Sequence, residues 1–241
     1  MADKLSALRD KKYLEITYGP ERSYKGEYPN KLAQKISTDF YKKPGKILDI
    51  GCGNGDFLKA FSELGYEVVG IDISPDVEKR LGDKFEVMNI DIEKEECQFA
   101  NEFDFVFSKS VIEHTRNPMS LLKFANKSLR PGGVSVIMTP SWEHTYWGPF
   151  YIDHTHVTPF TLPSLEEAME LADFTHVEGQ YFYQLPFTWK NRAYKTIPWI
   201  ISKLPIPYSP FYKVPWTGNN EINKLVRFSK EVMLLTSGVK E

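Results

Sequence analysis

The feature that most constrains the fold is a glycine-rich turn between an apolar run and a helix-like segment. The apolar run is Lys46–Ile50, and Gly51, Gly53 and Gly55 follow at alternate positions before Asp56 begins the predicted helix. Glycines in such a turn let the backbone pass close beneath a ligand, because there is no Cβ to clash with it. The strand, turn and helix therefore predict the first βα unit of an α/β sheet, with a ligand over the turn.

Short runs rich in Ile and Val recur between helix-like segments in the following residues. The predicted strands are Lys46–Ile50, Glu67–Ile71, Phe85–Asn89, Phe103–Ser108 and Val134–Thr139. The predicted helices between them are Asp56–Leu64, Asp76–Leu81 and Pro118–Leu129. This alternation indicates βαβ units, and right-handed crossovers then give a doubly wound sheet.

The first residue of the predicted helix after the turn bears on the ligand. A dinucleotide-binding turn carries glycine or alanine at the position that Asp56 holds here. A carboxylate there lies where a pyrophosphate would meet the helix N-terminus, so NAD and FAD are disfavoured. A nucleoside without phosphates fits better, and the acidic Asp49 and Asp56 are compatible with a cationic part of that ligand.

Acidic residues stand at the ends of the next two predicted strands. Asp72 lies about twenty residues beyond the turn, where a carboxylate can accept hydrogen bonds from both hydroxyls of a ribose. Asp91 ends the third strand, where it can accept a hydrogen bond from an exocyclic amine while the backbone N–H of Ile92 donates to the ring. These residues predict a ribose site and an adenine site.

Five motifs occur in order between residues 47 and 140. They are DIGCGNG at Asp49–Gly55, GIDIS at Gly70–Ser74, an acid at Asp91, FDFV and SVIEH within Phe103–His114, and LRPGG at Leu129–Gly133. With these motifs the chain resembles the class I S-adenosylmethionine (SAM)-dependent methyltransferases, in particular the small-molecule group that includes ubiquinone-biosynthesis enzymes. The resemblance implies SAM as cofactor and a Rossmann-like, doubly wound, seven-stranded sheet with an antiparallel final hairpin, formed by Gln180–Leu185 and Val232–Thr236.

The same resemblance implies roles for individual residues. The glycines of the turn approach the methionine part of SAM, Asp72 the ribose, and Asp91 with Ile92 the adenine, while the backbone of Ser108 contacts the amino group. The implied cofactor-binding set is Asp49, Gly51, Gly53, Gly55, Asp72, Ile73, Asp91, Ile92 and Ser108.

Methyl transfer to a hydroxyl needs a group that removes its proton, and His114 is a first candidate for this base. It follows Glu113 beyond the fourth strand, at the sheet edge where ligands bind in open α/β folds. A purely structural histidine in the first turn of a helix is the alternative. Related quinone methyltransferases bind a divalent metal through an E-x-x-E-H pattern here, but Ser110 replaces the first acid. We therefore expect no metal site.

A second polar cluster follows the fifth strand and supplies two further candidate bases, His154 and His156. The segment Asp153–Phe160 resembles the D-x-T-H-V-x-P-(F/Y) loop of methyltransferases found among polysaccharide-biosynthesis proteins. Both histidines would lie on one face of an extended segment and could share a metal or flank a substrate hydroxyl. The alternative is a histidine that hydrogen-bonds the backbone. Neighbouring aromatic residues could stack on a substrate or fill the loop's own small core.

The 241 residues are expected to form a single methyltransferase domain. Its parts are an N-terminal cap over residues 1–45, with a helix at Asn30–Tyr41, a cofactor-binding core over 46–140, acceptor-side loops and an insertion over 141–228, and a last strand and tail over 229–241. Within these, the last strand is predicted at Ser229–Ser237.

The insertion, residues 188–215, holds five basic residues, no acid and many aromatics and prolines. It suits either a lid over the acceptor or a peripheral contact with a membrane surface. We favour the lid, because the prolines would break the long amphipathic helix that membrane anchors usually employ.

Composition limits the partners. Thirty Lys and Arg against 32 Asp and Glu give a net charge of −2, without the basic excess that binds nucleic acid. Two cysteines without ligand spacing and the lack of a long apolar segment predict a cytoplasmic protein with no transmembrane segment. The leading hypothesis is transfer of a methyl group from SAM to an oxygen of a small molecule, a sugar or glycan precursor. The alternatives are quinone or other aromatic O-methylation, and a catalytically silent cofactor-binding module.

Overall fold

A computed structural model describes residues 26–209 and 220–241 of the chain. The strands are β1 (Lys46–Ile50), β2 (Glu67–Asp72), β3 (Glu86–Asn89), β4 (Phe103–Lys109), β5 (Leu129–Pro140), β6 (Phe174–Phe182) and β7 (Met233–Lys240). They form one seven-stranded sheet in the order β3-β2-β1-β4-β5-β7-β6. The first five strands run parallel, and β7 is antiparallel to both β5 and β6. The predicted fold class and its antiparallel final hairpin are therefore confirmed.

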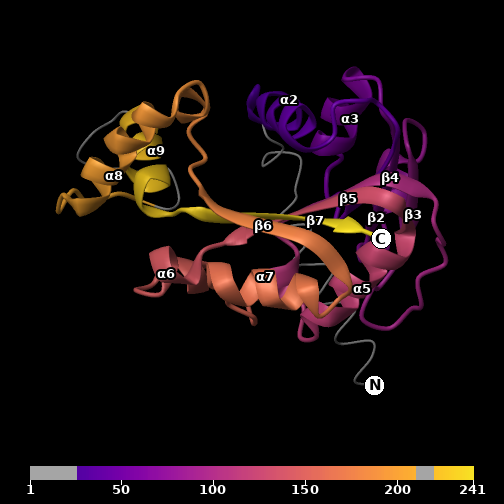
Figure 1. Cartoon of the computed structure of the whole chain (residues 1–241). Coiled ribbons are helices and arrows are strands. Elements are labelled where there is room, and N and C mark those ends of the chain that lie inside the picture. The colour runs from indigo at the N-terminus through magenta and orange to yellow at the C-terminus, as the bar shows by residue number, and fades with distance from the viewer. Residues whose placement is uncertain (1–25, 210–219) are drawn as a thin grey trace.

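Helices cover both faces of the sheet. The α-helices are α2 (Tyr28–Phe40), α3 (Asp56–Glu63), α4 (Val77–Leu81), α5 (Pro118–Ser128), α6 (Trp142–Thr145), α7 (Leu162–Glu170), α8 (Thr196–Lys203) and α9 (Asn220–Lys230). The 3₁₀ helices are η2 (Ile112–His114), η3 (Pro149–Ile152), η4 (Pro186–Trp189) and η5 (Arg192–Lys195). In Figure 1, α2 and α3 lie on one face, α5, α6 and α7 lie on the other, and α8 and α9 form a lobe at one end. In the described residues, no helix is long and apolar enough to cross a bilayer.

The centre of the sheet explains why the FDFVF run forms a strand. Phe103, Phe105 and Phe107 of β4 are fully buried. Phe103 packs in the core on the α5 and α7 face, whereas Phe105 and Phe107 pack in the core beneath α2 and α3. A strand buried on both faces needs a nearly continuous apolar run, which is the pattern observed.

Two predicted boundaries are wrong. Ser229 does not begin the last strand but lies in α9, where the buried residues Asn223, Val226 and Ser229 recur at intervals of three, a helical spacing. The fifth strand begins at Leu129 and not at Val134, because Leu129 already pairs with Phe103 before an irregularity in the ladder.

The other elements agree closely with the sequence. Helix α2 confirms the helix of the N-terminal cap, while residues 1–25 of that cap lie outside the described part of the chain. The final hairpin pairs Phe182 with Met233, although β6 starts earlier than predicted. Of the insertion, residues 188–209 are described, and they form short helices of which α8 packs against α9.

Candidate functional site

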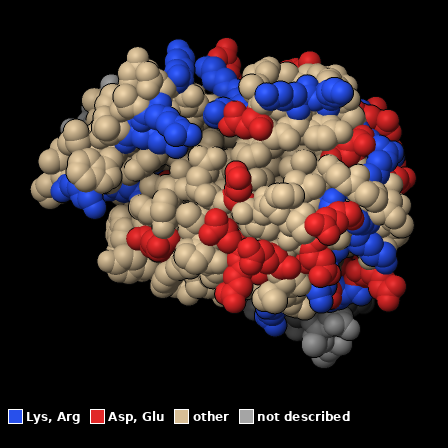
Figure 2. Space-filling view, in the orientation of Figure 1, with Lys and Arg blue, Asp and Glu red and all other residues tan. Residues whose placement is uncertain are grey.

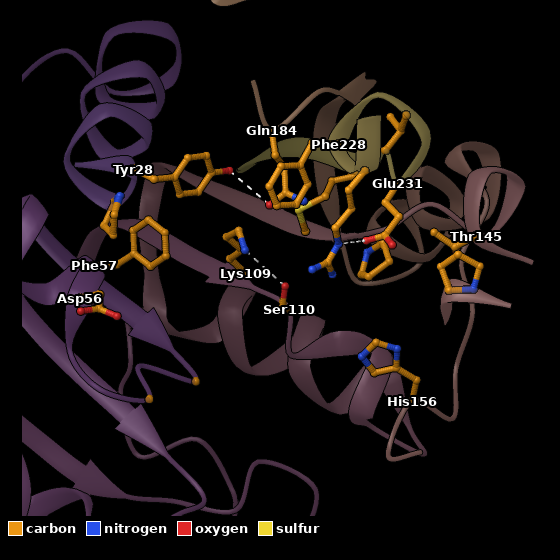
Figure 3. Close-up of a pocket in the computed structure, with 18 of the residues that line it drawn as sticks. Tyr28, Asp56, Phe57, Lys109, Ser110, Thr145, His156, Gln184, Phe228 and Glu231 are labelled. Atoms are coloured by element: carbon orange, nitrogen blue, oxygen red, sulfur yellow. Dashed lines mark hydrogen bonds and ion pairs between the residues drawn. The ribbon is translucent and has the colours of Figure 1, made fainter. Parts of the chain in front are cut away.

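A cavity of about 450 Å³ lies at the carboxyl ends of the parallel strands. The residues that follow β1, the end of β4 and the last residue of β5 all line it, together with parts of α2 and α9. Figure 3 shows Lys109 and Ser110 between the side formed by Asp56 and Phe57 and the side formed by Phe228 and Glu231, with His156 at one end. This is the edge of an α/β sheet at which ligands bind.

The glycine turn contributes one wall of this cavity. Gly51 and Gly53 line it with φ angles of +79° and +53°, a left-handed conformation that favours glycine. The N–H groups of Gly51 and Cys52 both donate to the carbonyl of Ile71, at 2.8 and 3.0 Å, which fixes the turn against β2. Gly55 faces away from the cavity, because a Cβ at this position would meet Leu81.

Asp72 holds the turn from the neighbouring strand. Its Oδ2 accepts a hydrogen bond from the N–H of Gly53 at 2.9 Å, and its Oδ1 accepts one from the N–H of Ser74 at 2.8 Å. A carboxylate oxygen has room for a second hydrogen bond. Asp72 is thus a structural part of the turn and can still accept from a ligand.

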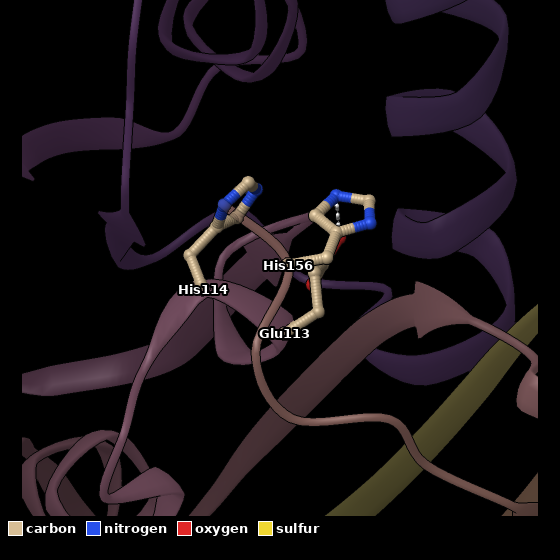
Figure 4. Close-up of side chains that lie close together, drawn as sticks. All are labelled: Glu113, His114 and His156. Carbon is tan, nitrogen blue, oxygen red and sulfur yellow. Dashed lines mark ion pairs between the residues drawn. The ribbon is translucent and has the colours of Figure 1, made fainter. Parts of the chain in front are cut away.

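Three groups that can bind a proton or a metal meet near the end of β4. The ligand atoms of Glu113, His114 and His156 lie within 4.8 Å of one another. Figure 4 shows the three side chains close together. Of the three candidate bases, His156 lines the cavity. The rings of His114 and His156 are 4.6 Å apart, whereas His154 is exposed and belongs to neither the cavity nor this cluster.

The hydrogen bonds of the two clustered histidines define their tautomers. Nδ1 of His156 lies 2.6 Å from the carbonyl oxygen of Phe150, so Nδ1 carries the proton and Nε2 has a free lone pair. Nδ1 of His114 lies 2.8 Å from Oγ1 of Thr155, whose hydroxyl donates to Asp153. The Thr155 oxygen therefore accepts from His114, and Nε2 of His114 also has its lone pair.

Glu113 is fully buried beside these rings. Thr139 donates to its Oε2 at 2.9 Å, while Oε1 has no hydrogen-bond partner among the described residues and lies 4.0 Å from Nε2 of His156. Burial raises the pKa of Glu113 to about 7. Burial, followed by the neighbouring His156, lowers the pKa of His114 to about 4, and burial also lowers the pKa of His156. Both histidines are therefore neutral at pH 7.

A family model described as a methyltransferase domain matches residues 22–178. The chain belongs to this family. In sequence and fold it is similar to the class I SAM-dependent methyltransferases.

Curated relatives agree with this assignment over part of their length. The ubiquinone biosynthesis O-methyltransferase of Psychrobacter arcticus is 31% identical over 103 residues, which cover 39% of this chain and 40% of the relative. The enzyme of the same name from Xanthomonas axonopodis pv. citri is 26% identical over 144 residues, 57% of this chain and 59% of the relative. The chain thus spans roughly half the length of the curated relatives it matches.

Solved structures with a similar fold match most of the chain. A SAM-dependent methyltransferase from Archaeoglobus fulgidus has a TM-score of 0.61 at 22% identity and covers 94% of this chain and 99% of its own. A putative methyltransferase in a complex with the Haloferax volcanii Trm112 activator has a TM-score of 0.67 at 18% identity, with 94% and 96% covered.

The buried acid of the methyltransferase turn fits a cationic cofactor. Asp49 is 3% exposed, and its Oδ2 has no hydrogen-bond partner in the described part of the chain. Burial, followed by repulsion from Asp72, raises the pKa of Asp49 to about 8. An orphaned carboxyl oxygen of this kind is compatible with SAM, which carries a sulfonium and an ammonium group.

Of the implied cofactor set, Gly51 and Gly53 line this cavity and the other seven residues do not. Ile73 is exposed, Ile92 packs on the core, and Asp91 forms an ion pair with Lys94 at 2.8 Å. They follow β2 and β3, which lie beside β1 in the sheet. Ser108 is buried and donates through Oγ to the carbonyl of Ile50 at 3.0 Å, so its side chain forms a hydrogen bond within the sheet.

Sequence reasoning missed several residues that line the methyltransferase cavity. Lys109 is the last residue of β4 and Ser110 follows it, and Nζ of Lys109 lies 3.5 Å from Oγ of Ser110. Burial lowers the pKa of Lys109. Arg227 and Glu231 of α9 form an ion pair of 2.6 Å at the cavity wall. The length of β4 could have indicated Lys109, but the α9 residues lie far from every motif.

The aromatic side chains of the loop after β5 lie outside the cavity. Trp142 packs on Phe150 with ring centroids 5.4 Å apart, so these two rings pack within the loop, whereas Phe160 is buried in the main core. Tyr146 and Tyr151 are exposed. None of the described residues 188–209 of the insertion lines the cavity either, so a lid over it has no support from this part of the chain.

Proposed function

We propose that this methyltransferase transfers a methyl group from SAM to a hydroxyl oxygen of a small molecule, with His156 as the general base. The observation that carries the proposal is the position of His156. It lines the cavity, its Nδ1 is held by the carbonyl of Phe150 at 2.6 Å, and its Nε2 has a free lone pair. A neutral imidazole with a defined tautomer is the form that a general base requires.

The residues of the turn would hold the cofactor. Gly53 would leave room for the methionine part, whereas Gly51 is needed for the turn itself, because a Cβ there would meet Val111. The carboxyl group of Asp49 would balance the positive charge of the cofactor, and Asp72 would accept from the ribose hydroxyls. Asp91 and the backbone of Ile92 would bind the adenine beside the cavity. When bound, SAM supplies an electrophilic methyl group on a positively charged sulfur.

The protein side of the reaction is then positioning and proton removal. The acceptor oxygen loses its proton to Nε2 of His156 as it attacks the methyl carbon, and the imidazolium that forms lies 4.0 Å from Oε1 of Glu113. A carboxylate at Glu113 stabilises that imidazolium through its opposite charge, while the carbonyl of Phe150, which accepts from Nδ1 at 2.6 Å, holds the ring in place. His114, 4.6 Å from the ring of His156, helps to orient it.

The expectation that no metal takes part stays a prediction. Its basis in the sequence is Ser110, which replaces the first acid of the E-x-x-E-H pattern. His156 nevertheless adds a third ligand atom to Glu113 and His114 within 4.8 Å. An assay with and without a chelator decides whether the cluster works as a base or as a metal site.

An aromatic hydroxyl is the acceptor that the observations favour. The curated relatives are named for O-methylation in ubiquinone biosynthesis, which supports an oxygen acceptor of this kind. A phenol, with a pKa near 10, also gives up its proton to a weak base more readily than a sugar hydroxyl does. A sugar or glycan precursor stays the second candidate, on the resemblance of the segment Asp153–Phe160.

The test is methyl transfer from SAM labelled in its methyl group to an extract separated into polar metabolites, glycans and lipids. We expect label in a hydroxyl-bearing fraction, in a form that resists mild alkali, because methyl ethers are stable and methyl esters are not. Label that alkali releases, or label on an amine, would contradict transfer to a hydroxyl oxygen. The fraction that carries the label distinguishes an aromatic acceptor from a glycan.

A further inference from the structure

Helix α8 presents large apolar side chains to solvent. Trp199 is 57% exposed and Ile200 53% exposed, and Ile197, one turn before Ile200, is exposed as well. The helix packs on α9 through its other side, where Pro198 is buried. Isolated exposed apolar residues are ordinary, but several on one short helix mark an interaction site.

A second exposed apolar segment lies next to the first. In the loop after α6, Trp147 is 55% exposed, and Tyr146, Tyr151 and Ile152 are also exposed. The ring of Trp147 lies 6.1 Å from that of Tyr208, which follows α8. A groove of about 590 Å³ is lined by residues of this loop and of the segment that follows α8, including Trp147, Pro149 and Pro205 to Tyr208. The loop after α6 therefore lies beside the chain that leaves α8.

The charge of the segment around α8 is opposite to that of the chain. The sequence holds no Asp or Glu from Gln180 to Asn220, although the net charge of the chain is −2. Four described residues of this segment are basic: Lys190, Arg192, Lys195 and Lys203. No ion pair joins them to any acid among the described residues. Figure 2 shows Lys and Arg over the lobe of α8 and α9.

We propose that this surface docks on an anionic lipid bilayer. We call it the α8 surface and define it by Ile197, Trp199 and Ile200 with Lys190, Arg192 and Lys203. Tryptophan and aliphatic side chains enter the interface of a bilayer, while unpaired basic side chains near them attract anionic headgroups. A protein partner or a second copy of the chain would pair these basic residues only if its own surface carried acidic groups at matching positions. An anionic bilayer presents negative charge over its whole area.

The α8 surface lies close to the site of methyl transfer. Pro149 lines both the groove beside α8 and the cavity that holds His156. A docked molecule would thus hold its cavity near the headgroup layer. Docking itself does not depend on the proposed acceptor or on the role of His156.

The test is sedimentation of the whole chain with vesicles of phosphatidylcholine alone and of phosphatidylcholine mixed with phosphatidylglycerol. We expect binding to the anionic vesicles that weakens as salt is added, since screening reduces the attraction. The double variants Trp199→Ser/Ile200→Ser and Arg192→Glu/Lys203→Glu should each lower vesicle affinity roughly tenfold or more. All four side chains are exposed, so SAM affinity measured by calorimetry should stay at the wild-type value and show that the variants fold.

The matched control is Leu171→Ser with Lys123→Glu, which changes an exposed apolar residue after α7 and an exposed basic residue on α5. It should bind vesicles as the wild type does. Equal sedimentation with neutral and anionic vesicles, no sedimentation with either, or equal loss in the control would overturn the proposal. So would a wild-type dimer that the Trp199→Ser/Ile200→Ser variant converts to a monomer without any vesicle binding. A wild-type chain that binds anionic vesicles but transfers no methyl group to a water-soluble acceptor would instead count against the proposed function alone.

Discussion

At the scale of single residues, Asp49 makes cofactor binding a proton-linked event. Its pKa of about 8 means that the carboxyl group is mostly protonated at pH 7 before SAM binds. A cation beside it favours the carboxylate and lowers that pKa, so binding should release of the order of one proton. Calorimetry in two buffers with different ionisation enthalpies measures this release. The Asp49→Asn variant should release no proton. If the wild type gives the same binding heat in both buffers, Asp49 does not lie beside the positive charge of SAM.

Asp72 offers a second test at the cofactor. Asp72→Asn removes an acceptor oxygen that now binds the N–H of Gly53 or of Ser74, at 2.9 and 2.8 Å. It also removes the charge that strengthens hydrogen bonds from ribose hydroxyls. We expect SAM affinity to fall by about 1–3 kcal/mol. A variant that folds and binds SAM as tightly as the wild type would show that Asp72 only shapes the turn.

The pKa of Glu113, about 7, predicts the pH dependence of catalysis. Below pH 7 the group is protonated and cannot stabilise an imidazolium at His156, whereas above pH 7 it is a carboxylate. The pKa values of His114 and His156 are lowered, so these rings stay neutral over the same range. We therefore expect kcat/KM to rise with pH through about 7, and Glu113→Gln to lower the rate and flatten that rise. A wild-type profile that falls across this range would refute the pairing of Glu113 with His156.

At the scale of elements, β4 is the central strand of the sheet, with helices packed on both of its faces. Phe107 is fully buried and lies with its ring 5.0 Å from that of Phe57 and 5.3 Å from that of Phe61, so the strand is joined to α3. Phe107→Ala should lower the free energy of unfolding by about 3–5 kcal/mol, measured in urea. Leu171→Ala, which truncates a side chain that is 66% exposed, is the control and should change it by less than about 0.5 kcal/mol. Equal effects would show that β4 is not the centre of the core.

Elements with a strong local pattern could be predicted from the sequence. Strand β1 has its predicted bounds because Lys46–Ile50 is an apolar run that ends directly at Gly51. The end of the chain could not be predicted as well. Val226 and Phe228 alternate as in a strand, but both lie in α9, where Val226 is buried by contacts that only the fold creates. Which side of a short apolar segment becomes buried depends on tertiary contacts, and propensity alone does not determine it.

At the scale of the whole molecule, the cofactor side of the site could be predicted from a local motif, whereas the contact between His156 and Glu113 could not. The glycine turn and Asp72 lie close together in sequence, so their motif indicated a shared ligand before the fold was known. His156 meets Glu113 because the N–H groups of Val157 and Thr158 both donate to the carbonyl of Glu113, at 2.9 and 3.1 Å. Such a contact between distant segments follows from the fold, and the sequence could offer three histidines without ranking them.

The measurement that tests the account most directly compares His156→Ala with His154→Ala, each assayed for methyl transfer to the identified acceptor and for SAM affinity. His154 is exposed and nearby in sequence, so it is the matched control. We expect His156→Ala to lower kcat about 10²- to 10⁴-fold, the usual contribution of a general base, while SAM affinity stays unchanged. His154→Ala should leave both values at the wild-type level. A His156→Ala enzyme with the wild-type kcat would contradict the central claim that this histidine removes the proton from the acceptor.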